Sequence, residues 1–268
     1  MEGLYVYCIR EKSGEAAEIS GSGIGGSEDV KIISHRDLEV AVSRVSLEQF
    51  GPEIRTKALE NLAWIKEKAV AHEMIIEAAM NCNGKLLNLI PMKFGTIFKE
   101  EAGLKEALDQ DYPLIKKVLE ITRGKQEWSV KAYLKDRKKF EQLIRKNNET
   151  IREAEKNMAD LPEGTAFFME EELNQAVSEV LDQELTRIAE SLYENLKKQI
   201  PQIVKINVLG KELTGRREPM VLNSACLIPE ADVEIFKKDL RRLNREIQAD
   251  GIYLESSGPW PAYNFTNY

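Results

Sequence analysis

The sequence has few of the residues from which catalytic and metal-binding sites are usually built. It contains three cysteines, Cys8, Cys82 and Cys226, and two histidines, His35 and His72, among 268 residues. The cysteines are widely spaced and form no C-x-x-C pair, which is typical of a reduced cytoplasmic protein and not of a zinc site or a disulfide framework. No Walker loop and no G-x-S-x-G motif is present. We therefore expect no enzyme activity and no catalytic, cofactor-binding or metal-binding residues.

A long hydrophobic run and a surplus of positive charge are also missing. No apolar stretch approaches the roughly 20 residues that a membrane-spanning helix needs, and the chain starts with a strand-like apolar run, Leu4–Ile9, instead of a signal peptide. The formal net charge is −7 and the pI is near 5.3. Because binding to phosphates requires clustered lysine and arginine, this charge argues against a nucleic-acid partner. We predict a cytoplasmic protein with no membrane span.

What is present is an ordinary globular composition, with 43% hydrophobic and 31% charged residues, in a chain long enough for two domains. The first half predicts an N-terminal α+β domain over residues 1–125. Its expected elements are a buried strand at Leu4–Ile9, a hairpin of Val30–Ile33 and Leu38–Val42, a helix from Pro52 to about Asn81, a strand at Leu89–Phe98 bent by Pro91, and a helix from Glu100 to about Thr122.

The second half, residues 126–268, alternates in the order β, long α, β, β, α, β. The expected strands and helices are Trp128–Leu134, Lys135–Asp160, Met169–Ile200, Ile203–Val208, Met220–Ile228, Pro229–Gln248 and Ile252–Glu255. This is the order of a ferredoxin-like fold, modified by a long helical hairpin inserted at about 135–200. The hairpin is either a solvated extension of the domain or a protruding arm that contacts a partner.

Several short segments allow a functional and a structural interpretation. Gly21–Gly26 matches G-x-G-x-x-G, but polar residues precede it and a strand follows it, so a flexible loop is the favoured interpretation.

The basic loop Gly210–Pro219 either binds an anion or is a hairpin loop with solvated charges. Glu170–Glu172 is expected at a helix start, where the helix dipole favours acidic residues. His72 has no second histidine one turn further on, so a structural, hydrogen-bonded role is favoured over metal binding.

The C-terminal segment Gly258–Phe265 has the sequence Gly-Pro-Trp-Pro-Ala-Tyr-Asn-Phe. Each proline fixes its own φ and pushes the residue before it towards an extended conformation. The segment should therefore leave the last strand as a stiff, extended chain. Because it carries three large aromatic side chains, we expect it to dock on the body of the protein or on a partner.

Two of these motifs together resemble one family. Leu89–Phe98, preceded by His72 and Glu77, is similar to the central L-P-x-R/K-F-G-T-x-F segment of the gas vesicle protein F/L (GvpF/GvpL) family, and Gly258–Phe265 resembles its G-P-W-P-P-Y-x-F terminus. The segments Arg217–Pro219 and Val221–Asn223 also resemble the region before that family's last helix. The departures are Lys93, where arginine is common, and Ala262, where a second proline is common.

The resemblance implies an accessory or minor structural protein of gas vesicle assembly, located in the cytoplasm and at the gas vesicle. Its implied partners are the hydrophobic shell-forming protein and other gas vesicle accessory proteins. The implied fold is two α+β domains, and no catalytic activity or cofactor comes with it. The alternative function left open is an anion- or nucleotide-binding regulatory domain, based on the Gly21 loop and on Lys211–Arg217.

The residues that carry the family motif have an expected structural role. They are His72, Pro91, Met92, Phe94, Gly95, Gly258, Pro259, Trp260, Pro261, Tyr263 and Phe265. Burial in the core is favoured over a partner interface because large apolar side chains are usually buried. We expect the C-terminal segment to dock between the two halves of the chain, against Leu89–Phe98, with Trp260 mostly buried. The sequence does not distinguish an F from an L member.

Overall fold

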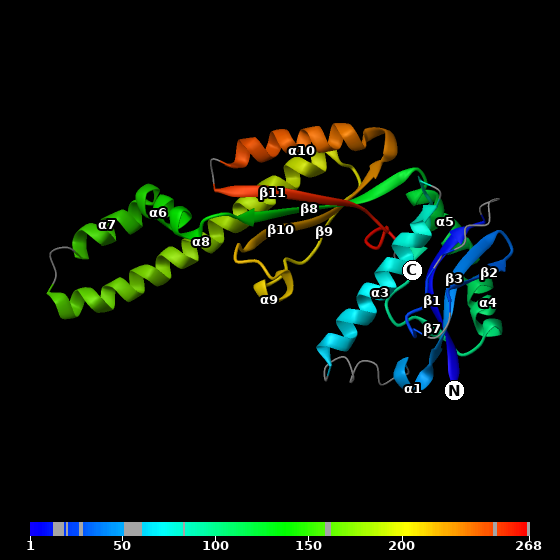
Figure 1. Cartoon of the computed structure of the whole chain (residues 1–268). Helices are drawn as coiled ribbons and strands as arrows, with labels where there is room; N and C mark the ends of the chain where they lie inside the picture. Colours follow the sequence, from blue (N-terminus) through cyan, green and yellow to red (C-terminus); the bar gives the residue numbers. More distant parts are fainter. Residues whose placement is uncertain are drawn as a thin grey trace. The chain divides into compact units, whose positions relative to one another are not determined.

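The computed structural model describes residues 1–12, 19, 21–26, 29–50, 61–82, 84–158, 162–248 and 251–266. The chain forms two compact units, and both contain helices and sheets, as the α+β prediction requires (Figure 1). The first unit consists of Met1–Glu127 together with Pro259–Tyr268, and the second of Trp128–Gly258. The C-terminal segment therefore belongs to the first unit, although the strand before it lies mostly in the second.

The first unit is built on an antiparallel sheet whose centre is β1 (Glu2–Glu11). The sheet order is β2-β3-β1-β6, with β7 also paired to β1. The other strands are β2 (Lys31–His35), β3 (Leu38–Ser46), β6 (Leu89–Pro91) and β7 (Ile97–Phe98). A separate two-stranded sheet joins β4 (Asn81–Cys82) and β5 (Lys85–Leu86). The predicted hairpin is confirmed. The single strand expected at Leu89–Phe98 is wrong, because the strand ends at Pro91 and resumes only at Ile97, as a proline inside a ladder favours.

A β-bulge in β1 determines which side chains face the first unit's two apolar clusters. The pairing register with β3 shifts between Val6 and Cys8. Tyr5 belongs to one cluster and Val6 to the other, as alternation requires. At the bulge, however, consecutive residues Tyr7 and Cys8 belong to the same cluster as Tyr5. Tyr5 and Tyr7 share the face that α3 covers by ordinary alternation, and the bulge adds Cys8 to that face.

Helices complete the two faces of this sheet. α3 (Leu62–Met80) belongs to the tyrosine face, while α4 (Glu101–Gln110) and α5 (Tyr112–Thr122) belong to the other cluster. A short helix, α1 (Leu47–Phe50), follows β3. In α3, the Asn61 side chain accepts a hydrogen bond from the Trp64 amide and caps the first turn. The predicted start at Pro52 lies outside the described residues.

The single helix predicted for Glu100–Thr122 is wrong, because the chain breaks between α4 and α5 at Asp111. Pro113 occupies the first turn of α5. A proline has no amide hydrogen and clashes with the preceding turn inside a helix, but it is accepted in a first turn. Pro113 therefore explains why the segment forms two helices.

The second unit contains a four-stranded sheet in the order β11-β8-β10-β9. These strands are β8 (Lys125–Leu134), β9 (Ile203–Lys205), β10 (Met220–Pro229) and β11 (Ile252–Trp260). β9 and β10 pair antiparallel. The alternation predicted for Trp128–Leu134 is confirmed, since Trp128, Val130, Ala132 and Leu134 all enter one apolar cluster.

The helices of this unit are α6 (Arg137–Asn147), α7 (Glu149–Met158), α8 (Glu163–Gln199), α9 (Lys211–Thr214) and α10 (Val233–Ile247), with a 3-10 turn at Glu230–Asp232. α6 and α7 pack along α8 away from the sheet (Figure 1). We call α6, α7 and the part of α8 beside them the helical arm. The C-terminal part of α8 and α10 pack on the sheet.

Two predictions for the arm are wrong in detail. The single helix expected at Lys135–Asp160 breaks at Asn148, whose side chain accepts a hydrogen bond from the Ile151 amide. Asparagine favours such caps because its side chain competes for backbone hydrogen bonds. α8 begins at Glu163 instead of Met169, so the acidic run Glu170–Glu172 lies inside the helix and not at its start.

Candidate functional site

The family-motif residues of the first unit form a buried hydrogen-bonded network around His72. The His72 side chain on α3 is 4% exposed and lies between Tyr5 of β1 and the loop after β6. Its Nδ1 is 3.1 Å from the Tyr5 hydroxyl, and its Nε2 is 3.1 Å from the Met92 carbonyl oxygen. The Gly95 amide donates to the same Tyr5 hydroxyl at 2.9 Å.

These contacts determine which group donates and which accepts in each hydrogen bond of the network. A carbonyl oxygen only accepts, so His72 donates from Nε2 to Met92. Its unprotonated Nδ1 then accepts from the Tyr5 hydroxyl, and the Tyr5 oxygen accepts from Gly95. Burial lowers the pKa of His72 to about 4, against the opposing effect of the Met92 hydrogen bond. Burial likewise raises the pKa of the Tyr5 hydroxyl. The network therefore consists of a neutral imidazole and a neutral phenol.

The loop between β6 and β7 is held against β1 by its backbone. The Met92 amide donates to the Tyr7 carbonyl at 2.8 Å. Gly95 has a φ of +84°, a region that side chains other than glycine's rarely adopt. The Phe94 ring contacts the rings of Tyr5 and His72 with its centroid 6.2 Å and 5.7 Å away. Replacing Gly95 or Phe94 would therefore disturb the support of His72.

A second tyrosine fixes the glycine-rich loop. The Ile24 amide donates to the Tyr7 hydroxyl at 2.8 Å, and this hydroxyl is 2.7 Å from the Ser43 hydroxyl. Ile24 is itself buried. The loop leads into β2, not into a helix, so it has no helix N-terminus to bind a pyrophosphate. In this structure Ile24 of the loop is part of the core.

The C-terminal segment is held by two carboxylates of the first unit. The Tyr263 hydroxyl donates to Glu73 Oε2 at 2.7 Å. The backbone amide and the side-chain amide of Asn264 donate to the two oxygens of Glu127, at 3.0 Å and 2.6 Å. Burial raises the pKa of both carboxyl groups, and the hydrogen bonds from the segment oppose this rise. The Tyr263 ring packs against the cluster that contains Tyr5 and Leu89.

This geometry can be compared with known proteins. The model of one family, described as gas vesicle synthesis protein GvpL/GvpF, matches residues 3–267. The chain belongs to the GvpL/GvpF family. It is 24% identical to gas vesicle protein L1 of Halobacterium salinarum over 98% of this chain and 90% of the relative. It is 23% identical to gas vesicle protein L of a Streptomyces species over 97% and 91%.

Solved structures of the family have the same fold. The crystal structure of the gas vesicle protein GvpF from an Anabaena species superposes with a TM-score of 0.70 at 18% identity, covering 100% of this chain and 97% of that one. GvpF from Microcystis aeruginosa superposes with a TM-score of 0.66 at 16% identity, covering 99% of each chain. The GvpL/GvpF family is a structural and accessory family and not a known enzyme family.

The motif of this GvpL/GvpF chain is only partly brought together. His72, Met92, Phe94 and Gly95 meet around Tyr5. Pro91 ends β6 and is buried, as is Pro261. Gly258 has a φ of +149°, and Pro259, Tyr263 and Phe265 are half-buried.

The expected burial of Trp260 is wrong, because 38% of this residue is exposed. The flanking Pro261 is buried, and the extended strand β11 points successive side chains in opposite directions. A docked backbone therefore does not bury every aromatic residue that it carries. Docking of the segment between the two halves of the chain stays a prediction.

In the basic loop of the second unit, Arg216 already contacts other residues of the protein. Arg216 donates to Glu255 at 2.7 Å, and its guanidinium lies 4.6 Å from the centre of the Tyr133 ring. The loop also contains the short helix α9. An anion would have to compete with Glu255 for Arg216, which weakens the anion-binding interpretation.

Other tests of a chemical site concern the described part of the chain. No helix there is long and apolar enough to cross a membrane, and no three histidine, cysteine, aspartate or glutamate side chains gather in a way that could hold a metal ion. Both ring nitrogens of His72 are already hydrogen-bonded. The network's contacts are those of a structural core.

Sequence reasoning missed the partners of the motif. The sequence pattern predicts only a strand at Tyr5 and Tyr7, and it assigns no role to Glu127 or Asn264. A polar residue in an apolar run, such as Tyr5 or Tyr7, is a usable signal because a buried hydroxyl needs a hydrogen-bond partner.

Proposed function

We propose that this GvpL/GvpF protein is an accessory or minor structural protein of gas vesicle assembly that binds the hydrophobic shell-forming subunit and other accessory proteins. The observation that carries the proposal is the family match over residues 3–267. We further propose that the protein acts in the cytoplasm and at the vesicle, without catalysis.

The end of the helical arm supports a contact with a hydrophobic subunit. Phe167 and Phe168, near the start of α8, are 67% and 70% exposed. Their rings lie edge to face with centroids 6.0 Å apart. Exposed neighbouring aromatic side chains are unusual on a monomer surface and are enriched at interaction sites. The arm is thus the proposed contact surface for the shell-forming subunit.

We also propose that the second unit is a modified ferredoxin-like domain. The sheet order β11-β8-β10-β9 and the crossovers through α8 and α10 support it, because a split βαβ fold places its fourth and third strands on either side of the first. We propose two domains, residues 1–125 and 126–268. The compact units differ from this division, because residues 126–127 and Pro259–Tyr268 belong to the first unit.

Deleting the gene for this protein in its host is expected to abolish gas vesicles, and the native gene should restore them. A Phe167→Ser/Phe168→Ser variant should restore roughly tenfold fewer vesicles, because exposed aromatic anchors contribute strongly to binding. The matched control is Leu213→Ser, another exposed apolar residue of the second unit. Electron microscopy and co-purification of the shell-forming subunit measure the outcome. Normal vesicles in the deletion strain would contradict the proposal.

The nucleotide-binding alternative has less support, since the Gly21 loop contributes to the core and Arg216 is paired. A thermal-shift panel of nucleotides and inorganic phosphate tests it directly. A ligand that binds only the native state raises the melting temperature. We expect no shift.

A further inference from the structure

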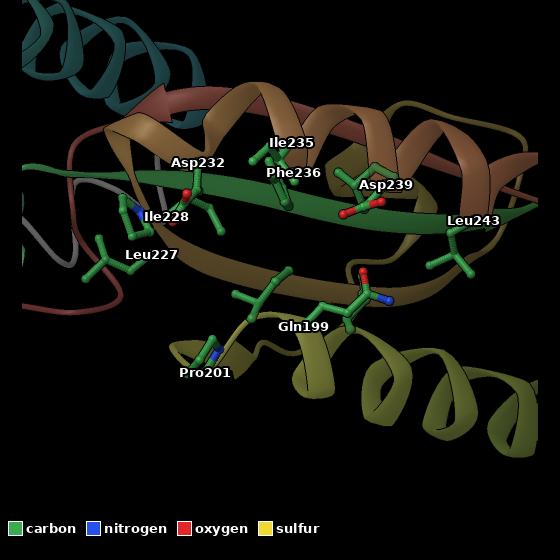
Figure 2. A pocket seen from close by; sticks show the side chains of 13 residues that line it. Gln199, Pro201, Leu227, Ile228, Asp232, Ile235, Phe236, Asp239 and Leu243 are labelled. Carbon is green, nitrogen blue, oxygen red and sulfur yellow. The ribbon is translucent and has the colours of Figure 1, made fainter.

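The second unit contains an apolar groove between its two sheet-packed helices. It is bounded by the C-terminal end of α8, the end of β10 and one side of α10 (Figure 2). Its volume is about 310 Å³. The residues that line it from α10 and from the 3-10 turn before α10 recur at helical spacing, from Asp232 through Ile235 and Phe236 to Leu243. This stretch spans about 16 Å at 1.5 Å per residue, or three helical turns.

The walls of this groove are apolar and one of them is open to solvent. Phe236, Leu240 and Leu243 are buried in the unit's core, while Ile235 is 61% exposed. Leu227 and Ile228 at the end of β10 form part of the floor. An exposed isoleucine beside an apolar hollow makes a larger continuous apolar surface than an isolated surface residue. The shape and the apolar lining of the groove suit a row of apolar side chains from a partner.

The charges at the groove have one sign. Among the described residues that line it, the ionisable side chains are Asp232 and Asp239. Asp232 immediately precedes α10 and Asp239 lies in it; they are seven residues apart, about 10 Å along the helix axis, and both line the groove. Asp239 is 3.1 Å from Arg242 of its own helix. In Figure 2 the Asp239 carboxylate lies on the side of α10 that faces Gln199 of α8. The groove therefore presents two carboxylates, and a positively charged ligand would compete with Arg242 for Asp239.

We propose that this groove binds an amphipathic helix of a partner protein, with an apolar face that fills the hollow and with lysine or arginine side chains two turns apart that pair with Asp232 and Asp239. Helices commonly bind apolar grooves through residues at i, i+3, i+4 and i+7. Opposite charges at the rim orient the ligand and select it. The inference rests on the proposed function and assigns a surface to the binding of accessory proteins.

A second copy of this chain is a poorer occupant. Its exposed aromatic pair, Phe167 and Phe168, is followed by the acidic run Glu170–Glu172. Insertion of that segment would place these carboxylates near Asp232 and Asp239. Juxtaposed like charges oppose association, so the groove selects a basic helix instead.

The test uses the full-length chain and two synthetic, fluorescently labelled helical peptides. Both carry leucine at i, i+3, i+4 and i+7; one has lysine at two flanking positions seven residues apart, and the other has glutamate there. Fluorescence anisotropy should show binding of the lysine peptide and roughly tenfold weaker binding of the glutamate peptide. Equal affinity for the two peptides, or no binding of the lysine peptide, would overturn the inference.

Variants locate the binding. Ile235→Asp should weaken the lysine peptide roughly tenfold or more, because it places a charge in the apolar contact. Asp239→Asn should weaken it less, and this difference should disappear at high salt, where surface charges are screened. Leu213→Asp is the matched control, since Leu213 is 76% exposed but does not line the groove. Unchanged binding by Ile235→Asp would contradict the inference, as would self-association of the native chain that Ile235→Asp abolishes.

Complementation separates this inference from the proposed function. If the deletion strain still forms vesicles, the proposed function fails, and the assignment of the groove to vesicle partners fails with it. If deletion abolishes vesicles and Ile235→Asp restores them as well as Leu213→Asp does, only the groove inference fails. If deletion abolishes vesicles, and Leu213→Asp restores them but Ile235→Asp does not, the result supports both the proposed function and the groove inference.

Discussion

Replacing His72 with alanine is expected to lower the free energy of unfolding of the first unit by about 3 kcal/mol. The change removes a buried ring, the donor to the Met92 carbonyl and the acceptor of the Tyr5 hydroxyl. Native-state hydrogen exchange of the β1 amides measures this unit separately from the second one. Val70→Ala is the control on the same helix; Val70 is 52% exposed, and its change should stay within about 0.5 kcal/mol. Equal exchange in the two variants would contradict a structural role for His72.

The same side chain gives the first unit a pH dependence. Burial lowers the pKa of His72 from 6.5 to about 4, so between these values the unfolded chain binds a proton that the folded unit does not. The contribution of neutral His72 to the free energy of unfolding is fully present above pH 6.5 and is lost as the pH falls towards 4. The total loss in the free energy of unfolding is about 3 kcal/mol. Glu73 and Glu127 have raised pKa values and act in the opposite direction. The stability of the first unit should be measured against pH in the native chain and in His72→Gln, because the difference between the two curves isolates the effect of the histidine. A difference that does not change with pH would contradict a neutral imidazole in the folded unit.

Ending the chain after Pro261 is expected to destabilise the first unit by about 4 kcal/mol, because hydrogen bonds to charged groups contribute roughly 1.5–3 kcal/mol each. The truncation removes the donors of both Glu73 and Glu127. It also removes the Tyr263 ring from the apolar cluster around Tyr5. Ser256→Ala, at an exposed position on β11, should change stability by less than about 0.5 kcal/mol.

Hydrogen exchange of the β1 and α3 amides measures the truncated chain. Exchange as slow as in the native chain would mean that the C-terminal segment is not part of the first unit's core. A truncated chain that keeps native stability but loses a partner would show that the segment is an interface instead.

Local patterns predicted the elements whose side chains repeat regularly. The alternation of Trp128–Leu134 predicts β8, and Pro229 with Glu230 predicts the start of a helix, which the 3-10 turn Glu230–Asp232 and α10 form. The breaks at Asp111 and Asn148 were also visible in the sequence, as Pro113 and as an asparagine with cap chemistry. The long apolar patterns of Glu100–Thr122 and Lys135–Asp160 predict one helix each, whereas the structure follows the local signals and has two helices in each segment.

The site was less predictable because its contacts join distant segments. Tyr263 and Glu73 are 190 residues apart, and Asn264 and Glu127 are 137 residues apart. No local pattern pairs a particular carboxylate with a particular donor at such separations. The exposure of Trp260 was unpredictable for the same reason, because the burial of a side chain depends on which residues of distant segments cover it. The resemblance to the family located the motif, but the partners of the motif came from the structure.

We infer that the motif by which the family is recognised holds the first unit together, and we propose that partners bind elsewhere. A double-mutant cycle of Tyr263→Phe and Glu73→Ala tests it most directly, because the coupling energy isolates the contact between the two side chains. We predict a coupling of about 1–2 kcal/mol in the stability of the first unit, with co-purification of the shell-forming subunit unchanged in Tyr263→Phe. Additive effects on stability, together with loss of the shell-forming subunit, would contradict the account.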